Sequence, residues 1–78
     1  MTRLELFGTA RCPHTREMRE WLEFRRCNFV EYDVETDPSA RRRMCELTGG
    51  QRNVPLLAED GKVVQVGWQG RTCIVEEL

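Results

Sequence analysis

The chain of 78 residues lacks long apolar runs, carries almost no net charge and contains a single histidine. No run approaches the ~20 apolar residues that a helix needs to cross a bilayer, so we expect no membrane partner. The first residues also lack the apolar core of a secretory signal, which predicts a cytoplasmic protein with reduced thiols. The 12 basic residues are balanced by 13 acidic ones, so we expect no nucleic-acid partner.

Because His14 is the only histidine, a cluster of metal ligands is hard to assemble and no metal site is expected. The four cysteines could form two disulfides in principle. A reducing compartment argues against such a framework, and it favours one reactive cysteine among unreactive ones.

The second cysteine that often lies three residues after a reactive one is absent, and Thr15 holds its position. Cys12 precedes Pro13, a residue suited to the first turn of a helix. Helix N-terminal amides and the cations of Arg11 and Arg16 would stabilise a Cys12 thiolate, which predicts a thiol pKa below that of free cysteine. The Thr15 hydroxyl could donate a hydrogen bond to this thiolate. Alternatively, Cys12 is a buried structural cysteine without redox activity. The alternative for Thr15 is a residue that the first turn of the helix merely tolerates.

Thr15 cannot close a disulfide with Cys12. An adduct on Cys12 must therefore be resolved by an outside thiol or by Cys27, Cys45 or Cys73. Cys73 is the best internal candidate, because it begins the expected last helix.

Alternating short strands and helical patterns predict one α/β domain over residues 1–78, with a four-stranded mixed sheet and flanking helices. In the first helix, Met18, Trp21 and Leu22 recur at helical spacing. The second helix has Asp37 as its N-cap and ends at Gly49. The Asp60–Gly61 pair indicates a hairpin. The order β-α-β-α-β-β-α places strands at 3–7, 28–34, 54–58 and 63–66, and helices at 13–26, 38–48 and 71–78.

This order, the motif Cys12-Pro13-x-Thr15 and the pair Val54-Pro55 resemble the glutaredoxins of the thioredoxin superfamily. The sequence is most similar to a bacterial glutaredoxin-like group with a U-P-x-T motif, where U is selenocysteine or cysteine. The resemblance covers nearly the whole chain. It implies a thioredoxin-like fold and a Cys12 thiolate that attacks disulfides or glutathionylated substrates.

The resemblance also implies how a substrate is held. It implies a cis Val54–Pro55 bond, with the Val54 backbone free to pair with an extended thiol peptide. Glutathione becomes the expected outside thiol, with Gly67 in the matching glycine loop. Its carboxylates need a partner, and Arg52 or the neighbouring Gln51 could supply it. Typical members carry Gly-Gly-x-Asp-Asp in this loop, whereas Trp68 takes the second glycine position here.

The sequence thus predicts a monomeric, monothiol thiol–disulfide oxidoreductase. Glutathione is the expected co-substrate, thiol or disulfide proteins are the expected partners, and no cofactor is held tightly. One alternative is a binding module of the same fold with weak or lost redox activity. Another is an iron–sulfur carrier of the monothiol type, although Pro13 stiffens the turn that would open around a cluster.

Overall fold

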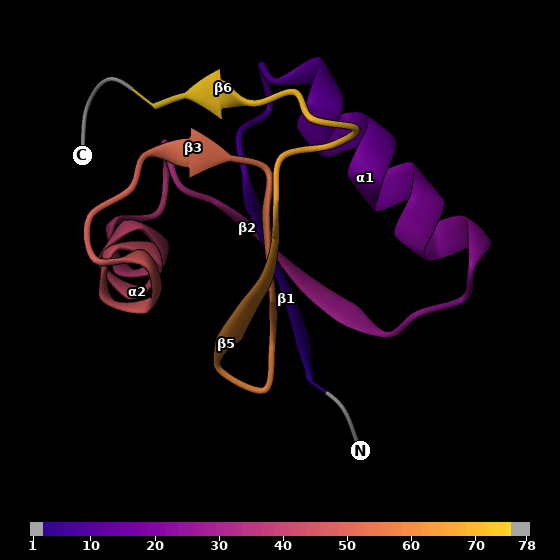
Figure 1. The fold of residues 1–78 in the computed structure, drawn as a ribbon, viewed down its shortest axis with the longest axis horizontal. Helices are drawn as coiled ribbons and strands as arrows, with labels where there is room; N and C mark the ends of the chain where they lie inside the picture. The colour runs from indigo at the N-terminus through magenta and orange to yellow at the C-terminus, as the bar shows by residue number, and fades with distance from the viewer. Residues whose placement is uncertain (1–2, 76–78) are drawn as a thin grey trace.

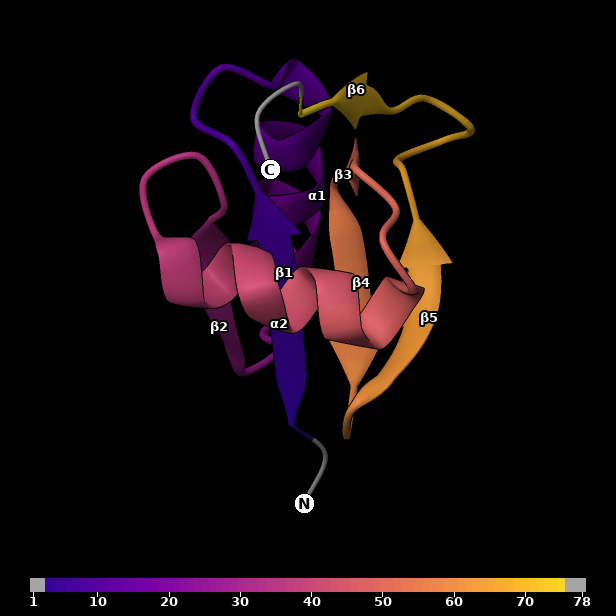
Figure 2. The same ribbon diagram turned by 90° about the vertical axis from the view of Figure 1, so that its left-hand side faces the viewer.

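A computed structural model describes residues 3–75 of the chain, and Figures 1 and 2 show its ribbon from two sides. No helix within these residues is long and apolar enough to span a membrane. The elements in chain order are β1 (Leu4–Gly8), α1 (Pro13–Phe24), β2 (Phe29–Asp33), α2 (Pro38–Thr48), β3 (Asn53–Val54), β4 (Leu56–Glu59), β5 (Lys62–Val66) and β6 (Cys73–Ile74).

The main sheet has four strands in the order β2-β1-β4-β5. Strands β1 and β2 are parallel, while β1–β4 and β4–β5 are antiparallel, as a mixed sheet requires. Helices α1 and α2 cover opposite faces of this sheet (Figure 1). The expected thioredoxin-like architecture, with a four-stranded mixed sheet between helices, is therefore confirmed.

Helix α1 starts at Pro13, where the missing N–H costs no helical hydrogen bond. It ends before the expected residue 26, because Arg26 takes a left-handed conformation with φ 58°. Met18 and Leu22 are buried as expected, but Trp21 is 37% exposed. The predicted apolar face of α1 was therefore wrong at Trp21, and Thr15 is buried together with Met18 and Leu22.

Helix α2 has the two ends that the sequence indicates. The Asp37 carboxylate accepts hydrogen bonds from the amides of Ser39 (3.0 Å) and Ala40 (3.2 Å). Gly49 closes the helix with φ 73°, a conformation that glycine adopts without strain. Both local predictions are confirmed.

The hairpin between β4 and β5 turns at Asp60 and Gly61, whose φ angles are 51° and 81°. Two consecutive positive φ angles are typical of the turn that Asp–Gly pairs favour. The expected strand 54–58, however, is interrupted at Pro55: Asn53–Val54 form β3, and β4 begins at Leu56. Proline has no amide hydrogen to donate to a ladder, which explains this break.

The expected helix over 71–78 was wrong in the described residues. Cys73–Ile74 form β6, which pairs antiparallel with β3 in a separate two-stranded sheet. Three consecutive apolar residues from Cys73 to Val75, two of them β-branched, favour a strand over a helix. Residues 76–78 of the expected helix lie outside the described residues.

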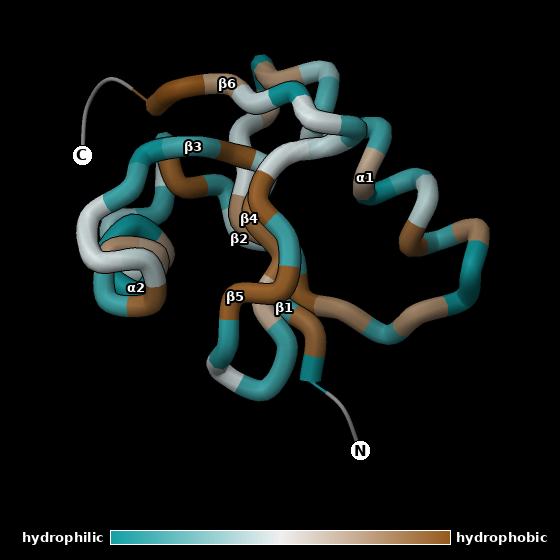
Figure 3. Tube along the Cα trace, viewed as in Figure 1, coloured by the Kyte–Doolittle hydropathy of each residue, from teal (hydrophilic) through white to brown (hydrophobic). Residues whose placement is uncertain are grey.

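Two apolar clusters hold the helices to the sheet. Leu6 and Leu57 pack with Met18 and Leu22 beneath α1. The larger cluster lies towards α2 and extends to Cys12 and to the end of β6; its buried members are Phe7, Cys12, Val34, Ala40, Met44, Val54, Leu56, Ala58 and Val75. Figure 3 shows brown, apolar stretches along the central strands. The core thus extends to Cys12 at the start of α1.

Candidate functional site

Cys12 is the N-cap residue of α1, with an extended backbone (φ −87°, ψ 113°). Its carbonyl oxygen accepts a hydrogen bond from the Arg16 amide at 3.3 Å. The Cys12 side chain therefore lies at the N-terminal end of α1, where the first amide groups have no partner within the helix, as the sequence predicts. Cys12 is only 2% exposed, because it belongs to the larger apolar cluster.

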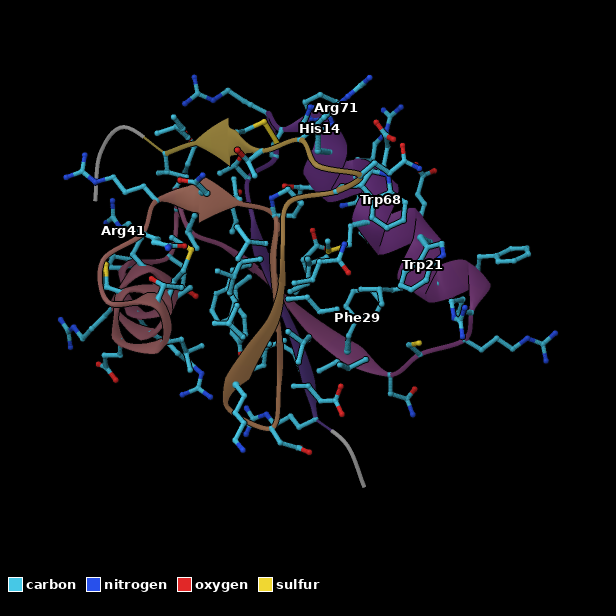
Figure 4. The ribbon with its side chains drawn as sticks, in the orientation of Figure 1. His14, Trp21, Phe29, Arg41, Trp68 and Arg71 are labelled. Carbon is cyan, nitrogen blue, oxygen red and sulfur yellow. A yellow bond between two sulfur atoms is a disulfide. The ribbon has the colours of Figure 1, made fainter. Side chains whose placement is uncertain are left out.

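The sulfur of Cys12 is bonded to that of Cys73, 61 residues later in the chain. The Cα atoms are 6.1 Å apart, within the usual range for a disulfide. Figure 4 shows this bond between β6 and the start of α1. We expected a site with one cysteine that depends on an outside thiol. This was wrong for this structure, because β6 places the sulfur of Cys73 in bonding contact with that of Cys12. Cys73 was the internal candidate, although β6 and not a helix carries it.

A tight turn after β5 brings the chain back towards Cys12. The Gly67 amide donates to the Pro55 carbonyl at 2.6 Å, and Trp68 and Arg71 exchange two backbone hydrogen bonds of 2.8 and 3.0 Å. A side chain at Gly67 would place its Cβ 2.7 Å from the Arg71 carbonyl oxygen, and the φ of Gly67 is 85°. Glycine is therefore required here, for a turn that leads directly into β6.

Trp68 anchors this turn on α1. Its indole Nε1 donates to Glu17 at 3.1 Å, and its ring lies 5.5 Å from that of Trp21. His14 approaches the same Glu17 carboxylate at 3.8 Å. Figure 4 shows His14, Trp68 and Trp21 along one side of the helix. The structure thus places Trp68 in contact with α1.

The Val54–Pro55 peptide bond is cis, as the resemblance implies. The backbone of Val54 is not free, however, because Val54 pairs with Cys73 and Asn53 pairs with Ile74. A further hydrogen bond of 2.9 Å runs from the Val75 amide to the Arg52 carbonyl. The edge expected to receive a thiol peptide is thus occupied by the chain itself.

Thr15 is 2% exposed, and its hydroxyl has no hydrogen-bond partner among residues 3–75. A Cβ atom on Gly8 would come within 2.6 Å of the Thr15 hydroxyl oxygen, so the absence of a side chain at Gly8 makes room for Thr15. A buried hydroxyl without a partner is costly. Its predicted bond to a Cys12 thiolate belongs to the reduced protein, and it stays a prediction.

The three arginines of the predicted site lie in different surroundings. Arg11 forms an ion pair with Glu35, and its hydrogen bond holds the pKa of the Glu35 carboxyl below the ordinary value. Arg16 pairs with Glu20 at 3.7 Å, and its side chain is 72% exposed. Arg52 is exposed, and its backbone carbonyl accepts a hydrogen bond from the Val75 amide, directly after β6. Their roles towards a thiolate or a carboxylate remain predictions.

A pocket of about 560 Å³ opens beside the disulfide. Cys12, Cys73 and Val54 contribute to its wall, and Arg11, Glu35 and Arg41 bring charged groups to it. The pocket therefore combines a disulfide with cationic and anionic side chains. It is large enough for a few residues of an extended thiol compound.

Sequence reasoning missed two contributors to the site: the Trp68–Glu17 contact and Val75, which is 4% exposed beside Cys12. The β-branched Ile74–Val75 pair was a signal for a strand. No local signal relates Trp68 to Glu17, because 51 residues separate them.

Cys27 and Cys45 are free and half-buried. Within residues 3–75, no group of three or more histidine, cysteine or acidic side chains is arranged to hold a metal ion.

Comparison with known proteins identifies the family of the chain. A family model described as Glutaredoxin matches residues 4–64. An uncharacterized glutaredoxin-like 8.6 kDa protein in the rubredoxin operon of Clostridium pasteurianum is 28% identical over 61 residues, covering 78% of this chain and 80% of that protein.

Solved structures agree in fold. The thioredoxin-like protein BC3987 superimposes with a TM-score of 0.75 at 29% identity, covering 85% of this chain and 88% of that one. A buckwheat glutaredoxin, solved as a complex with glutathione, has a TM-score of 0.67 at 17% identity and covers 85% and 61% of the two chains. Because the glutaredoxin model spans more than half of the sequence and the fold agrees, the chain belongs to the glutaredoxin family of the thioredoxin superfamily.

Proposed function

We propose that this protein is a thiol–disulfide oxidoreductase that works with two cysteines, Cys12 as the nucleophile and Cys73 as the resolving thiol. The observation that carries the proposal is the bond between Cys12, at the start of α1, and Cys73 in β6. The general activity follows from the family, and the pairing of these cysteines supports the two-cysteine cycle.

In the first step, the Cys12 thiolate attacks a substrate disulfide. One sulfur of the substrate becomes bonded to Cys12, and the other leaves as a thiolate. In the second step, the Cys73 thiolate attacks the Cys12 sulfur, and the substrate leaves as its second thiolate. The substrate disulfide has then gained two electrons, and the protein has lost two in forming Cys12–Cys73.

Glutathione is the reductant we propose for the return step. Two glutathione thiols would open Cys12–Cys73, giving two protein thiols and one glutathione disulfide. Support comes from the family, from the buckwheat glutaredoxin solved with glutathione and from Arg11 and Arg41 in the wall of the pocket. In this proposal the chain acts as a monomer on protein substrates in the cytoplasm, where such a reductant is maintained.

The test is mass analysis after incubation with oxidised glutathione. Wild-type protein should lose two hydrogens and yield a Cys12–Cys73 peptide. The Cys73→Ser variant should stop with one glutathione on Cys12, and Cys12→Ser should lose glutathione-dependent reduction of a mixed disulfide. A wild-type protein that accumulates the Cys12 adduct would contradict the resolving role, and retained activity in Cys12→Ser would contradict the whole assignment.

A further inference from the structure

Strand β6 closes over the nucleophile. Cys73 and Ile74 pair with Val54 and Asn53, and the Val75 amide donates to the Arg52 carbonyl at 2.9 Å. With β6 in place, Cys12 is 2% exposed. A substrate that pairs with the same edge of β3 while it bonds to the Cys12 sulfur therefore has to displace β6.

The two residues after Cys73 lie in opposite environments. Ile74 is 68% exposed, whereas Val75 is 4% exposed and packs in the cluster that contains Cys12 and Val54. This alternation is the ordinary pattern of a strand with one buried face. The surface beneath β6 thus offers a backbone edge and an apolar recess two residues beyond the cysteine.

We infer that β6 is an internal stand-in for the substrate, so that the two exclude each other from the same surface. The substrate is an extended polypeptide whose reactive cysteine replaces Cys73 and whose second following residue, a small β-branched apolar one, replaces Val75. This inference rests on the proposed function, and it adds a sequence preference of the protein substrate and its competition with β6. The edge accepts two residues beyond the cysteine, whereas glutathione has only one, which favours a polypeptide.

The chemistry of the exchange stays balanced. With β6 lifted, the Cys12 thiolate bonds to the cysteine sulfur of the docked polypeptide, and the former partner of that sulfur leaves as a thiolate. When the Cys73 thiolate then attacks the Cys12 sulfur, β6 returns to its edge and the polypeptide leaves as a thiol. Closure of β6 therefore accompanies release of the product.

The experiment compares three peptides, each carrying thionitrobenzoate on its cysteine, with the reduced Cys73→Ser chain. The first is Thr-Cys-Ile-Val, the second Thr-Cys-Ile-Asp and the third Thr-Cys-Asp-Val. Release of thionitrobenzoate reports attack by Cys12, and the Cys12→Ser/Cys73→Ser chain supplies the blank for the other thiols. We expect the second peptide to react about tenfold more slowly than the first, since a buried valine side chain is lost. The third should match the first, because the place of Ile74 is exposed.

Variants of β6 and of the residue after it test whether this strand and the peptide compete for the same surface. In the Cys73→Ser background, Val75→Ala should speed the reaction with the first peptide several-fold, because β6 loses its buried anchor. Ile74→Ala is the matched control and should leave the rate unchanged. Circular dichroism of each variant confirms that the fold is retained.

The outcomes separate the two proposals. Equal rates for the first two peptides would overturn the inferred substrate class, even if Cys12 reacts well with all of them. Equal rates for Val75→Ala and Ile74→Ala in a folded chain would overturn the competition by β6. No reaction of Cys12 with any disulfide would instead overturn the proposed function.

Discussion

At the scale of single residues, Glu5 on β1 needs hydrogen-bond partners, because its carboxylate has no solvent exposure. Arg43 on α2 meets it with two hydrogen bonds of 2.7 Å, from Nε and from a terminal nitrogen. This bidentate pair satisfies both carboxylate oxygens. The hydrogen bonds from Arg43 hold the pKa of Glu5 below its ordinary value of 4.5. The pair therefore ties α2 to the sheet only while Glu5 is ionised.

Acid should weaken the fold through this residue. A carboxyl whose folded pKa is lowered adds stability above its unfolded pKa, and this stability is lost as the pH falls below about 4.5, through the folded pKa. Glu5→Gln should reduce the free energy of unfolding by about 1 kcal/mol near neutral pH and flatten its decline in acid. Urea unfolding measured across the pH range checks both effects. Glu46→Gln, an exposed neighbour on α2, is the control, and an acid profile shared by both variants would contradict the role of Glu5.

Thr15 should influence the redox equilibrium through its buried hydroxyl. That hydroxyl has no hydrogen-bond partner within the described part of the oxidised chain, whereas a Cys12 thiolate would give it an acceptor after reduction. Thr15→Val should therefore shift the Cys12–Cys73 equilibrium towards the disulfide by roughly tenfold. Equilibration with glutathione buffers measures the shift. Thr36→Val, in an exposed turn, should behave like wild type, and a Thr15→Val chain that also does so would contradict the predicted bond.

At the scale of elements, β6 is short and relies on neighbours for its position. Its two residues pair with the two residues of β3, and the preceding turn is held on α1 by Trp68, which contacts Glu17 and Trp21. A two-stranded ribbon of this length has little stability of its own in water. The anchor at Trp68 therefore contributes to keeping Cys73 within reach of Cys12.

Loss of that anchor should weaken the disulfide. Trp68→Ala removes a ring contact and an indole hydrogen bond, and we expect the equilibrium constant for Cys12–Cys73 formation to fall about tenfold. Phe24→Ala removes an aromatic ring of α1 that is 85% exposed, so it should leave this constant unchanged. Glutathione redox titration measures both variants. An unchanged constant in Trp68→Ala would mean that β3 pairing alone positions Cys73.

At the scale of the whole molecule, the disulfide links the start of α1 to the far end of the described chain. The linked residues are 61 positions apart, and a closed loop of this length restricts the unfolded chain strongly. A domain of 78 residues has a small core. The redox state should therefore govern a large share of the total stability.

Reduction should lower the free energy of unfolding by up to about 4 kcal/mol. Urea unfolding with and without a reductant measures this difference, and Cys73→Ser should reproduce the reduced value. The Cys27→Ser/Cys45→Ser chain is the control, since it keeps the disulfide and should lose stability on reduction as wild type does. Equal stability of the two redox states would contradict the link between the disulfide and the fold.

Much of the fold was predictable because its signals are local. The Asp37 cap, the Gly49 stop and the Asp60–Gly61 turn each depend on the conformational preference of one or two residues. The parallel pairing of β1 with β2 follows from the strand–helix–strand pattern between them. Trp21 shows the limit of such patterns, because helical spacing alone does not decide which aromatic residue at the margin of a stripe is covered.

The sequence by itself determined that Cys12 stands at the start of a helix, with Pro13 behind it and Thr15 one turn on. Only the tertiary structure decided that Cys73 is its partner and that β6 occupies the edge of β3. The physical reason is range: a helix cap or a turn is stabilised by neighbours in the chain, whereas a disulfide and a strand pairing depend on groups that folding brings together. The position of Cys73 follows from contacts made by Gly67 and Trp68 with distant elements, and no spacing in the sequence encodes those contacts.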